Sequence, residues 1–71
     1  MADIKYEIVK KVAVLSESST GWTKEVNLVS WNEREPKVDI REWNHGQNKM
    51  SKGITLSAEE LLKLKQALEE L

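Results

Sequence analysis

The fold of this chain follows from two short stretches, Val38-Asp39-Ile40-Arg41-Glu42-Trp43 and, after a polar turn, Lys52-Gly53-Ile54-Thr55-Leu56-Ser57. Apolar and polar residues alternate in the first stretch, which is the period of a half-buried β-strand. Asp39, Arg41 and Trp43 therefore share one face. Val38 and Ile40 share the other. The second stretch predicts a shorter strand that ends where a helix begins. Arginine beside tryptophan on an open sheet face suits nucleic-acid bases, because the ring stacks on a base and the guanidinium meets a phosphate.

Two further strands are predicted upstream, over residues 4–15 and 22–31. β-Branched residues favour a strand in residues 4–15, but its apolar residues change phase along the way. This strand is therefore either buried in part on both faces or carries a bulge near Lys10. The connection over residues 32–36 is short enough to join the second strand to the third, residues 37–43, as an antiparallel hairpin.

A loop over residues 44–51 and a fourth strand over residues 52–56 lead to one helix. Ser57, followed three residues later by Glu60, matches a capping box. Leucines at helical spacing predict an amphipathic helix that continues to the C-terminus. These leucines are Leu61, Leu64, Leu68 and Leu71. The predicted fold class is α+β: a four-stranded antiparallel sheet followed by one C-terminal helix (ββββα), in a single domain over residues 1–71. On the third strand and its neighbour, we assign the predicted core to Val26, Leu28, Val38 and Ile40.

The small size of the chain points to self-association. A domain of 71 residues buries only about 60% of the surface its unfolded chain exposes. Small domains compensate with disulfides, metals or oligomerisation. The chain has no cysteine and one histidine, which excludes disulfides and leaves no ordinary zinc site. We therefore expect a homodimer.

Composition also narrows the classes of function. Eleven Lys and Arg against 12 Asp and Glu give a formal net charge of −1, whereas nucleic-acid-binding proteins are usually basic. A binding surface would therefore be a local patch on the sheet. The absence of cysteine fits the cytoplasm, and we expect neither a signal peptide nor a membrane span. His45 alone in a loop cannot complete a catalytic set, so we expect no enzyme and no cofactor.

Several fragments together resemble the small single-stranded-DNA-binding transcriptional positive cofactors, and the bacterial YdbC-like branch in particular. In chain order the similar fragments are Leu15-Ser16-Glu17, Gly21-Trp22, Val29-Ser30-Trp31-Asn32, Glu35-Pro36-Lys37, Val38-Asp39-Ile40-Arg41-Glu42-Trp43, Lys52-Gly53-Ile54-Thr55-Leu56 and the leucine-rich helix from Ser57. The resemblance implies a curved four-stranded sheet backed by one helix and assembled as a dimer. It also implies a channel for single-stranded DNA along the sheet surfaces. The turn Asn32-Glu33-Arg34-Glu35 is more acidic than the basic hairpin of that family.

The resemblance also carries over individual positions. Arg41 falls on the arginine of the family's Asp-Ile-Arg-Glu motif, Trp43 on or next to the following aromatic residue, and Trp31 on an aromatic residue at the tip of the second strand. Lys24 and Lys52 fall on basic positions. The nucleic-acid-binding residues predicted in this way, with two added from the sequence pattern, are Trp22, Lys24, Trp31, Lys37, Arg41, Trp43 and Lys52.

Each of these residues has a structural alternative. Trp31 and Trp43 would equally pack on each other or at a dimer interface, and Trp22 would cover the apolar face at a sheet edge. Arg41, next to Asp39 and Glu42, would form a surface ion pair across strands, which contributes little to stability. Any single lysine of the chain is more often a solvated surface residue than a residue that contacts a ligand.

The pattern as a whole predicts a homodimeric single-stranded DNA-binding protein with little sequence specificity, acting in transcription, replication or repair. Bases would stack on Trp31 and Trp43, and cations would meet phosphates. RNA is a third possibility, since stacking accepts either nucleic acid. The alternative from another class is a protein-interaction module, in which the same tryptophans anchor a partner protein. The near-zero net charge favours this rival, and the dependence of affinity on salt separates the two.

Overall fold

The computed structural model describes residues 5–71, so the predicted first residue of the first strand, Ile4, lies outside the described residues. The elements are β1 (Tyr6–Glu17), β2 (Thr23–Trp31), β3 (Lys37–Asn44), a 3-10 helix (His45–Gln47), β4 (Lys49–Met50), β5 (Ile54–Leu56) and α1 (Ala58–Leu68). The predicted α+β class is confirmed: an antiparallel sheet precedes one C-terminal helix. The predicted loop before the last strand contains the 3-10 helix and the additional short strand β4.

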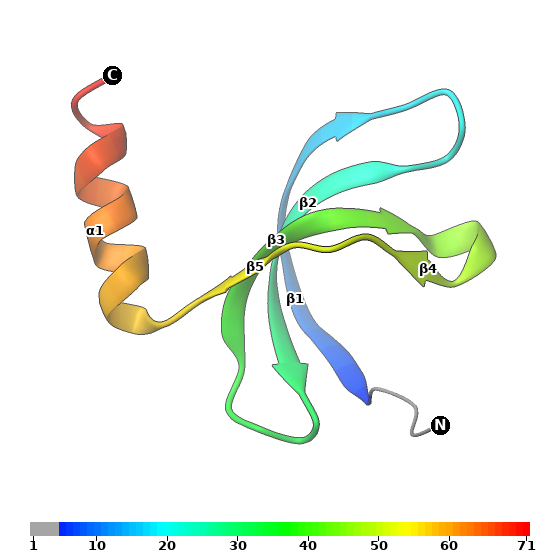
Figure 1. Ribbon diagram of the computed structural model, residues 1–71, viewed down its shortest axis with the longest axis horizontal. Coiled ribbons are helices and arrows are strands. Elements are labelled where there is room, and N and C mark those ends of the chain that lie inside the picture. Colours follow the sequence, from blue (N-terminus) through cyan, green and yellow to red (C-terminus); the bar gives the residue numbers. More distant parts are fainter. Residues whose placement is uncertain (1–4) are drawn as a thin grey trace.

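The sheet runs in the order β1-β2-β3, and two short strands share the far edge of β3. β4 pairs with the end of β3, where Met50 lies opposite Trp43. β5 pairs with its beginning, where Leu56 lies opposite Val38. In the view of Figure 1 the strands converge near the centre of the sheet and fan out toward their ends. The predicted hairpin between β2 and β3 is confirmed.

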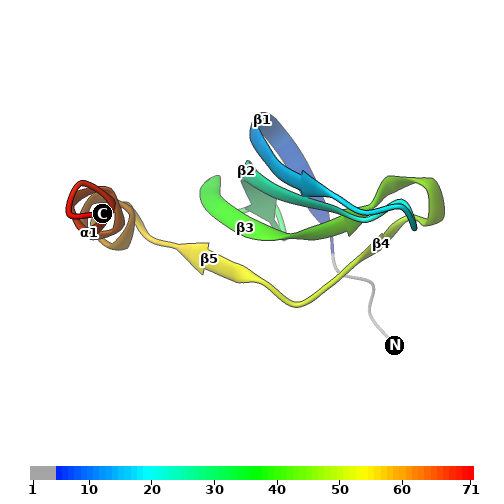
Figure 2. The same ribbon diagram turned by 90° about the horizontal axis from the view of Figure 1, so that it is seen from above.

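Strand β1 is irregular along its whole length. Its register with β2 shifts at three places, the first between Ile8 and Lys10. Of the two alternatives predicted for this strand, the shift favours an irregularity near Lys10. Because of the shifts Lys11 lies opposite Asn27, whereas Lys10 lies opposite Leu28. Directly opposed residues project from the same face of a sheet, so the two neighbouring lysines point to different sides. Bulges bend a strand and increase its twist, and the sheet is visibly curled (Figure 2).

The curled sheet has an inner and an outer face. The inner face is the side that carries the odd-numbered residues of β2 and β3. Five of its residues are at most 1% exposed: Glu25, Asn27, Val29, Asp39 and Trp43. The outer face carries the four residues predicted as core, and all of them are only half-buried. The predicted sides are therefore reversed, because the sheet curls over its own inner face.

Helix α1 begins as the sequence predicts. The side chain of Ser57 accepts from the backbone of Glu60, and the carboxylate of Glu60 accepts from the backbone of Ser57, which confirms the capping box. The helix ends at Leu68 rather than at the C-terminus. It stands beside the sheet at the end of β5 and does not lie over either face (Figures 1 and 2). None of its residues is buried, and Leu61 and Leu64 are half-buried, so the leucine stripe is only partly covered by the described residues. In residues 5–71 no helix has the length and apolar character needed to cross a membrane.

Candidate nucleic-acid interface

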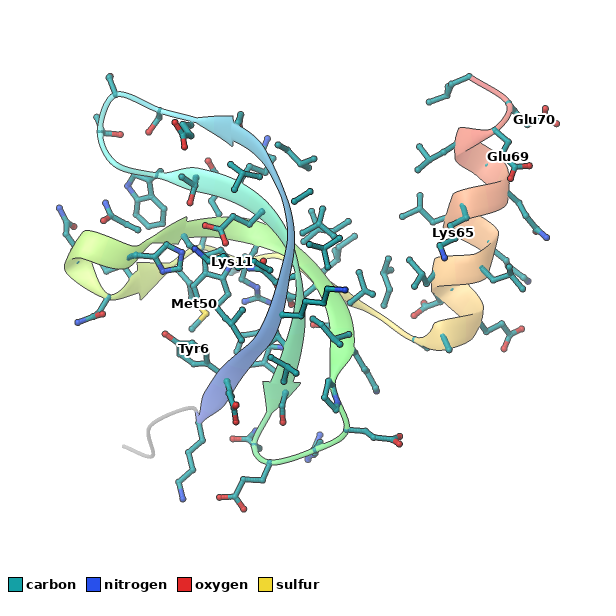
Figure 3. The ribbon with its side chains drawn as sticks, turned by 180° about the vertical axis from the view of Figure 1, so that it is seen from behind. Tyr6, Lys11, Met50, Lys65, Glu69 and Glu70 are labelled. Carbon is teal, nitrogen blue, oxygen red and sulfur yellow. The ribbon has the colours of Figure 1, made fainter. Side chains whose placement is uncertain are left out.

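Four rings form a continuous row across the inner face, which we call the ring row: His45, Trp43, Tyr6 and Trp31. His45 and Trp43 are stacked, with 5.7 Å between centroids and 5° between planes. Tyr6 tilts against both tryptophans, 5.3 Å from Trp43 and 5.7 Å from Trp31. These separations lie in the favourable range for aromatic pairs. Figure 3 shows Tyr6 and Met50 on the same side of the sheet, and each of them neighbours Trp43.

The four rings differ in their access to solvent. Tyr6 is 42% exposed, the His45 side chain is 44% exposed, and Trp31 is half-buried. Trp43 is 1% exposed, because Tyr6 and His45 pack against it. The prediction that Trp43 offers an open stacking surface is therefore wrong. The surface of the row consists of Tyr6, Trp31 and His45, with Trp43 behind them.

Arg41 is committed to contacts within the protein. Its Nε donates to Oδ1 of Asp39 at 2.6 Å and its Nη2 donates to Oδ2 at 2.8 Å. The side chains are 13% and 0% exposed. An ion pair therefore forms, but it lies within one strand and below the surface, not across strands at the surface as the alternative had it. The guanidinium also lies 4.5 Å from the centroid of Trp31, a cation–π distance. Arg41 therefore covers one side of Trp31 and does not present an open phosphate contact as predicted.

A second buried carboxylate, Glu25, holds the other end of the row. It accepts hydrogen bonds from Thr23 Oγ1, from Asn27 Nδ2 at 2.9 Å and from His45 Nε2 at 2.9 Å. Burial raises the pKa of Glu25, but these three hydrogen bonds outweigh it and hold the pKa below its ordinary value of 4.5. Glu25 is thus a carboxylate at neutral pH, and it fixes the orientation of the His45 ring.

Of the predicted lysines, Lys37 reaches the inner face. It lies opposite Val29, is exposed and lines a cleft of about 300 Å³ beside the ring row. The residues around this cleft are Trp31, Arg34, Glu35, Lys37 and Thr55. Lys11, which was not among the predicted site residues, also faces inward, opposite Asn27.

The remaining predicted residues lie apart from the ring row. Lys24 lies opposite Glu42 on the outer face, the side that also carries Val26. Trp22 is half-buried and lines a separate shallow hollow with Glu42. Lys52 is exposed in the segment between β4 and β5. The structure therefore brings together Trp31, Trp43, Arg41 and Lys37, but not the other three.

Tyr6 and His45 are the residues that the sequence interpretation missed. Tyr6 opens the first strand, and a register in which it faces Trp31 would have placed it on the tryptophan face. His45 gave no usable signal, because its position depends on the turn after β3. Within the described part of the chain, no group of three or more His, Cys, Asp or Glu residues is arranged to hold a metal ion.

The chain is similar to known proteins over most of its length. Residues 18–67 match the family described as Transcriptional Coactivator p15 (PC4). An uncharacterized protein of Treponema pallidum (strain Nichols) is 41% identical over 66 residues, which cover 93% of this chain and 78% of that protein. The matched region contains three members of the ring row and leaves out Tyr6. The chain belongs to the family of Transcriptional Coactivator p15 (PC4).

Proposed function

We propose that this protein is a homodimer that binds single-stranded DNA with little sequence specificity, in a coactivator-like role in transcription or in replication or repair. Membership of the PC4 family supports DNA binding and a coactivator-type role. The observation that carries the proposal is the ring row, in which three rings reach solvent from one face of the sheet. Stacking on such rings accepts any base, because every base has a π-face.

Local charge supports the same proposal despite the net charge of −1. The two acidic residues deepest in the inner face, Glu25 and Asp39, are each paired with an internal donor. Lys11 and Lys37 are exposed at the inner face, and Arg34 lines the cleft beside Trp31. These three cations would supply the phosphate contacts of the proposed interface.

The homodimer is supported by how little apolar surface one chain buries. Among residues 5–71, Val29 and Trp43 are the two buried apolar residues. The half-buried outer face and the start of α1 form an apolar groove of about 260 Å³, lined in part by Leu28, Val38 and Leu61. A core this small rarely stabilises a fold alone. A second copy covering the outer face and the helix would complete it.

Binding of fluorescently labelled oligo-dT tests the proposal. We expect saturable binding that is stronger than binding to duplex and that weakens as salt rises, since phosphate contacts release counterions. Trp31→Ala should weaken binding at least about five-fold, from the 1–3 kcal/mol that a stacked base contributes. Trp22→Ala, a tryptophan away from the ring row, serves as the matched control. Binding no tighter than to duplex, or equal loss in both variants, contradicts the proposal.

A protein-interaction module is the second candidate. The acidic Glu35 in the cleft beside Trp31 favours a polypeptide there, because it repels phosphate. Affinity for such a partner would centre on aromatic contacts and change little with salt.

RNA is the third possible ligand, because stacking accepts either nucleic acid. Competition between oligo-dT and an RNA strand of equal length reports which nucleic acid the ring row prefers.

A further inference from the structure

The sequence interpretation assigned no functional role to His45, a member of the ring row. Its contacts in the structure indicate one. We propose that His45 is a base-stacking residue of the nucleic-acid interface, and that its imidazolium form also contacts a backbone phosphate. In this arrangement His45 takes the stacking role that was predicted for Trp43. The inference rests on the proposed function, since it names a further contact of the same single-stranded ligand.

The ring of His45 is fixed in three ways. Trp43 stacks on one face with only 5° between the planes. Glu25 holds the ring edge through Nε2 at 2.9 Å. The backbone is anchored too, because Asn44, which is 4% exposed, caps the 3-10 helix by accepting from the backbone of Gln47 at 3.2 Å. A ring held in place loses little conformational entropy when a base stacks on it.

The exposed part of the ring is the part a ligand can use. One face lies against Trp43 and one edge lies against Glu25, and both partners are 1% exposed. The side chain is nevertheless 44% exposed, so solvent reaches the opposite face and the remaining edge. A base stacked on the opposite face would extend the stack from Trp43 outward. The buried Trp43 then supports the platform without touching the ligand.

The hydrogen bond to Glu25 determines what a proton adds. Because Nε2 donates to a carboxylate, Nδ1 of the neutral ring can only accept, and a phosphate offers only acceptors. In the imidazolium both nitrogens donate, and the ring carries a charge. Two charged groups lie on the elements packed against the turn that carries His45. They are Glu25 on β2 and Lys49 on β4, whose backbone pairs with Asn44. On β3 the ring of His45 contacts Trp43, which is uncharged. Protonation therefore converts His45 from a stacking surface into a stacking surface with a phosphate donor.

The test compares oligo-dT affinity of the wild-type chain with His45→Ala and His45→Phe, at about pH 6 and about pH 8. We expect His45→Ala to weaken binding at least about five-fold at both pH values, the effect of one stacked base. His45→Phe should bind much as the wild type does at the higher pH but should lack the gain at the lower pH. Gln47→Ala, an exposed residue of the same turn, is the matched control and should bind as the wild type does.

A second measurement does not depend on any variant folding. His45 is the one histidine of the sequence, so its ring protons give a single set of NMR signals. Stacking should move these signals upfield when oligo-dT is added. Wild-type binding that weakens in Trp31→Ala but not in His45→Ala, with unmoved histidine signals, overturns this inference and leaves the proposed function standing. Absence of any oligo-dT binding by the wild type overturns both.

Discussion

Gly53 crosses directly over Arg41: a Cβ added at Gly53 would overlap the Cβ of Arg41 and the carbonyl oxygen of Ile40. This close approach brings β5 against the start of β3, where Thr55 Oγ1 donates to Asp39 Oδ2 at 2.9 Å. Only a glycine fits at this position without a shift of the neighbouring backbone. The close approach at Gly53 therefore places β5 next to the ion pair of Asp39 and Arg41, which lies beneath the ring row.

Gly53→Ala should destabilise the fold by about 1–3 kcal/mol, the usual effect of inserting a methyl group into a packed site. The overlap is with backbone and with a Cβ, so rotating a side chain cannot relieve it. Urea unfolding followed by tryptophan fluorescence measures the change. Gly46→Ala is the control, since its Cβ would meet only the Asn44 side chain at 3.6 Å. Equal stability of the two variants would show that the crossing is loose.

Asp39→Asn should lower the free energy of unfolding by about 3–5 kcal/mol, because it leaves the largely buried charge of Arg41 without its partner. The same change should weaken oligo-dT binding, since Arg41 also covers Trp31. Glu42→Gln, an exposed position on the same strand, is the control. A loss below about 1 kcal/mol, the value of an exposed pair, would mean that water reaches the pair in solution.

The stabilising effect of Glu25 should disappear in acid. Its pKa is lower in the folded chain than the ordinary value of 4.5, so its contribution is present above that value and is lost as pH falls through the folded pKa. Wild type should therefore be more stable than Glu25→Gln at neutral pH, and the difference should shrink below pH 4.5. Chemical denaturation across this range gives the difference directly. A difference that stays constant with pH would assign it to packing and not to ionisation.

Local rules predicted the elements of this fold well but predicted its core poorly. Alternation gave the paired strands, and Ser57 with Glu60 gave the start of the helix, because each depends on neighbours in sequence. The same alternation implied that the face with Asp39 and Arg41 is open, since it treats polar residues as solvent-facing. The middle of that face is closed, because each buried carboxylate has a hydrogen-bonding partner on its own strand or in the turn after β3, whereas rings at its surface stay exposed.

The site was predicted only in part for the same physical reason. Trp31 and Lys37 followed from strand parity, but the buried state of Trp43 depends on Tyr6, 37 positions earlier in the chain. His45 reaches Glu25 across 20 positions. Contacts this distant depend on the bulges of β1 and on the turn after β3, and neither leaves a periodic signal.

The helix offers the sharpest test of the proposed dimer. Leu62 and Leu68 are 57% and 54% exposed on a helix that has no fully buried residue. In a homodimer these leucines would pack against the second copy, so light scattering of the wild type should give twice the mass of one chain. Leu68→Lys should shift the protein toward monomer and lower its unfolding midpoint, because a charge cannot enter an apolar interface without a partner. Gln66→Lys adds the same charge at an exposed position of α1 and should leave the mass unchanged. A monomeric wild type, or a dimer that Leu68→Lys does not weaken, would remove the helix from the interface.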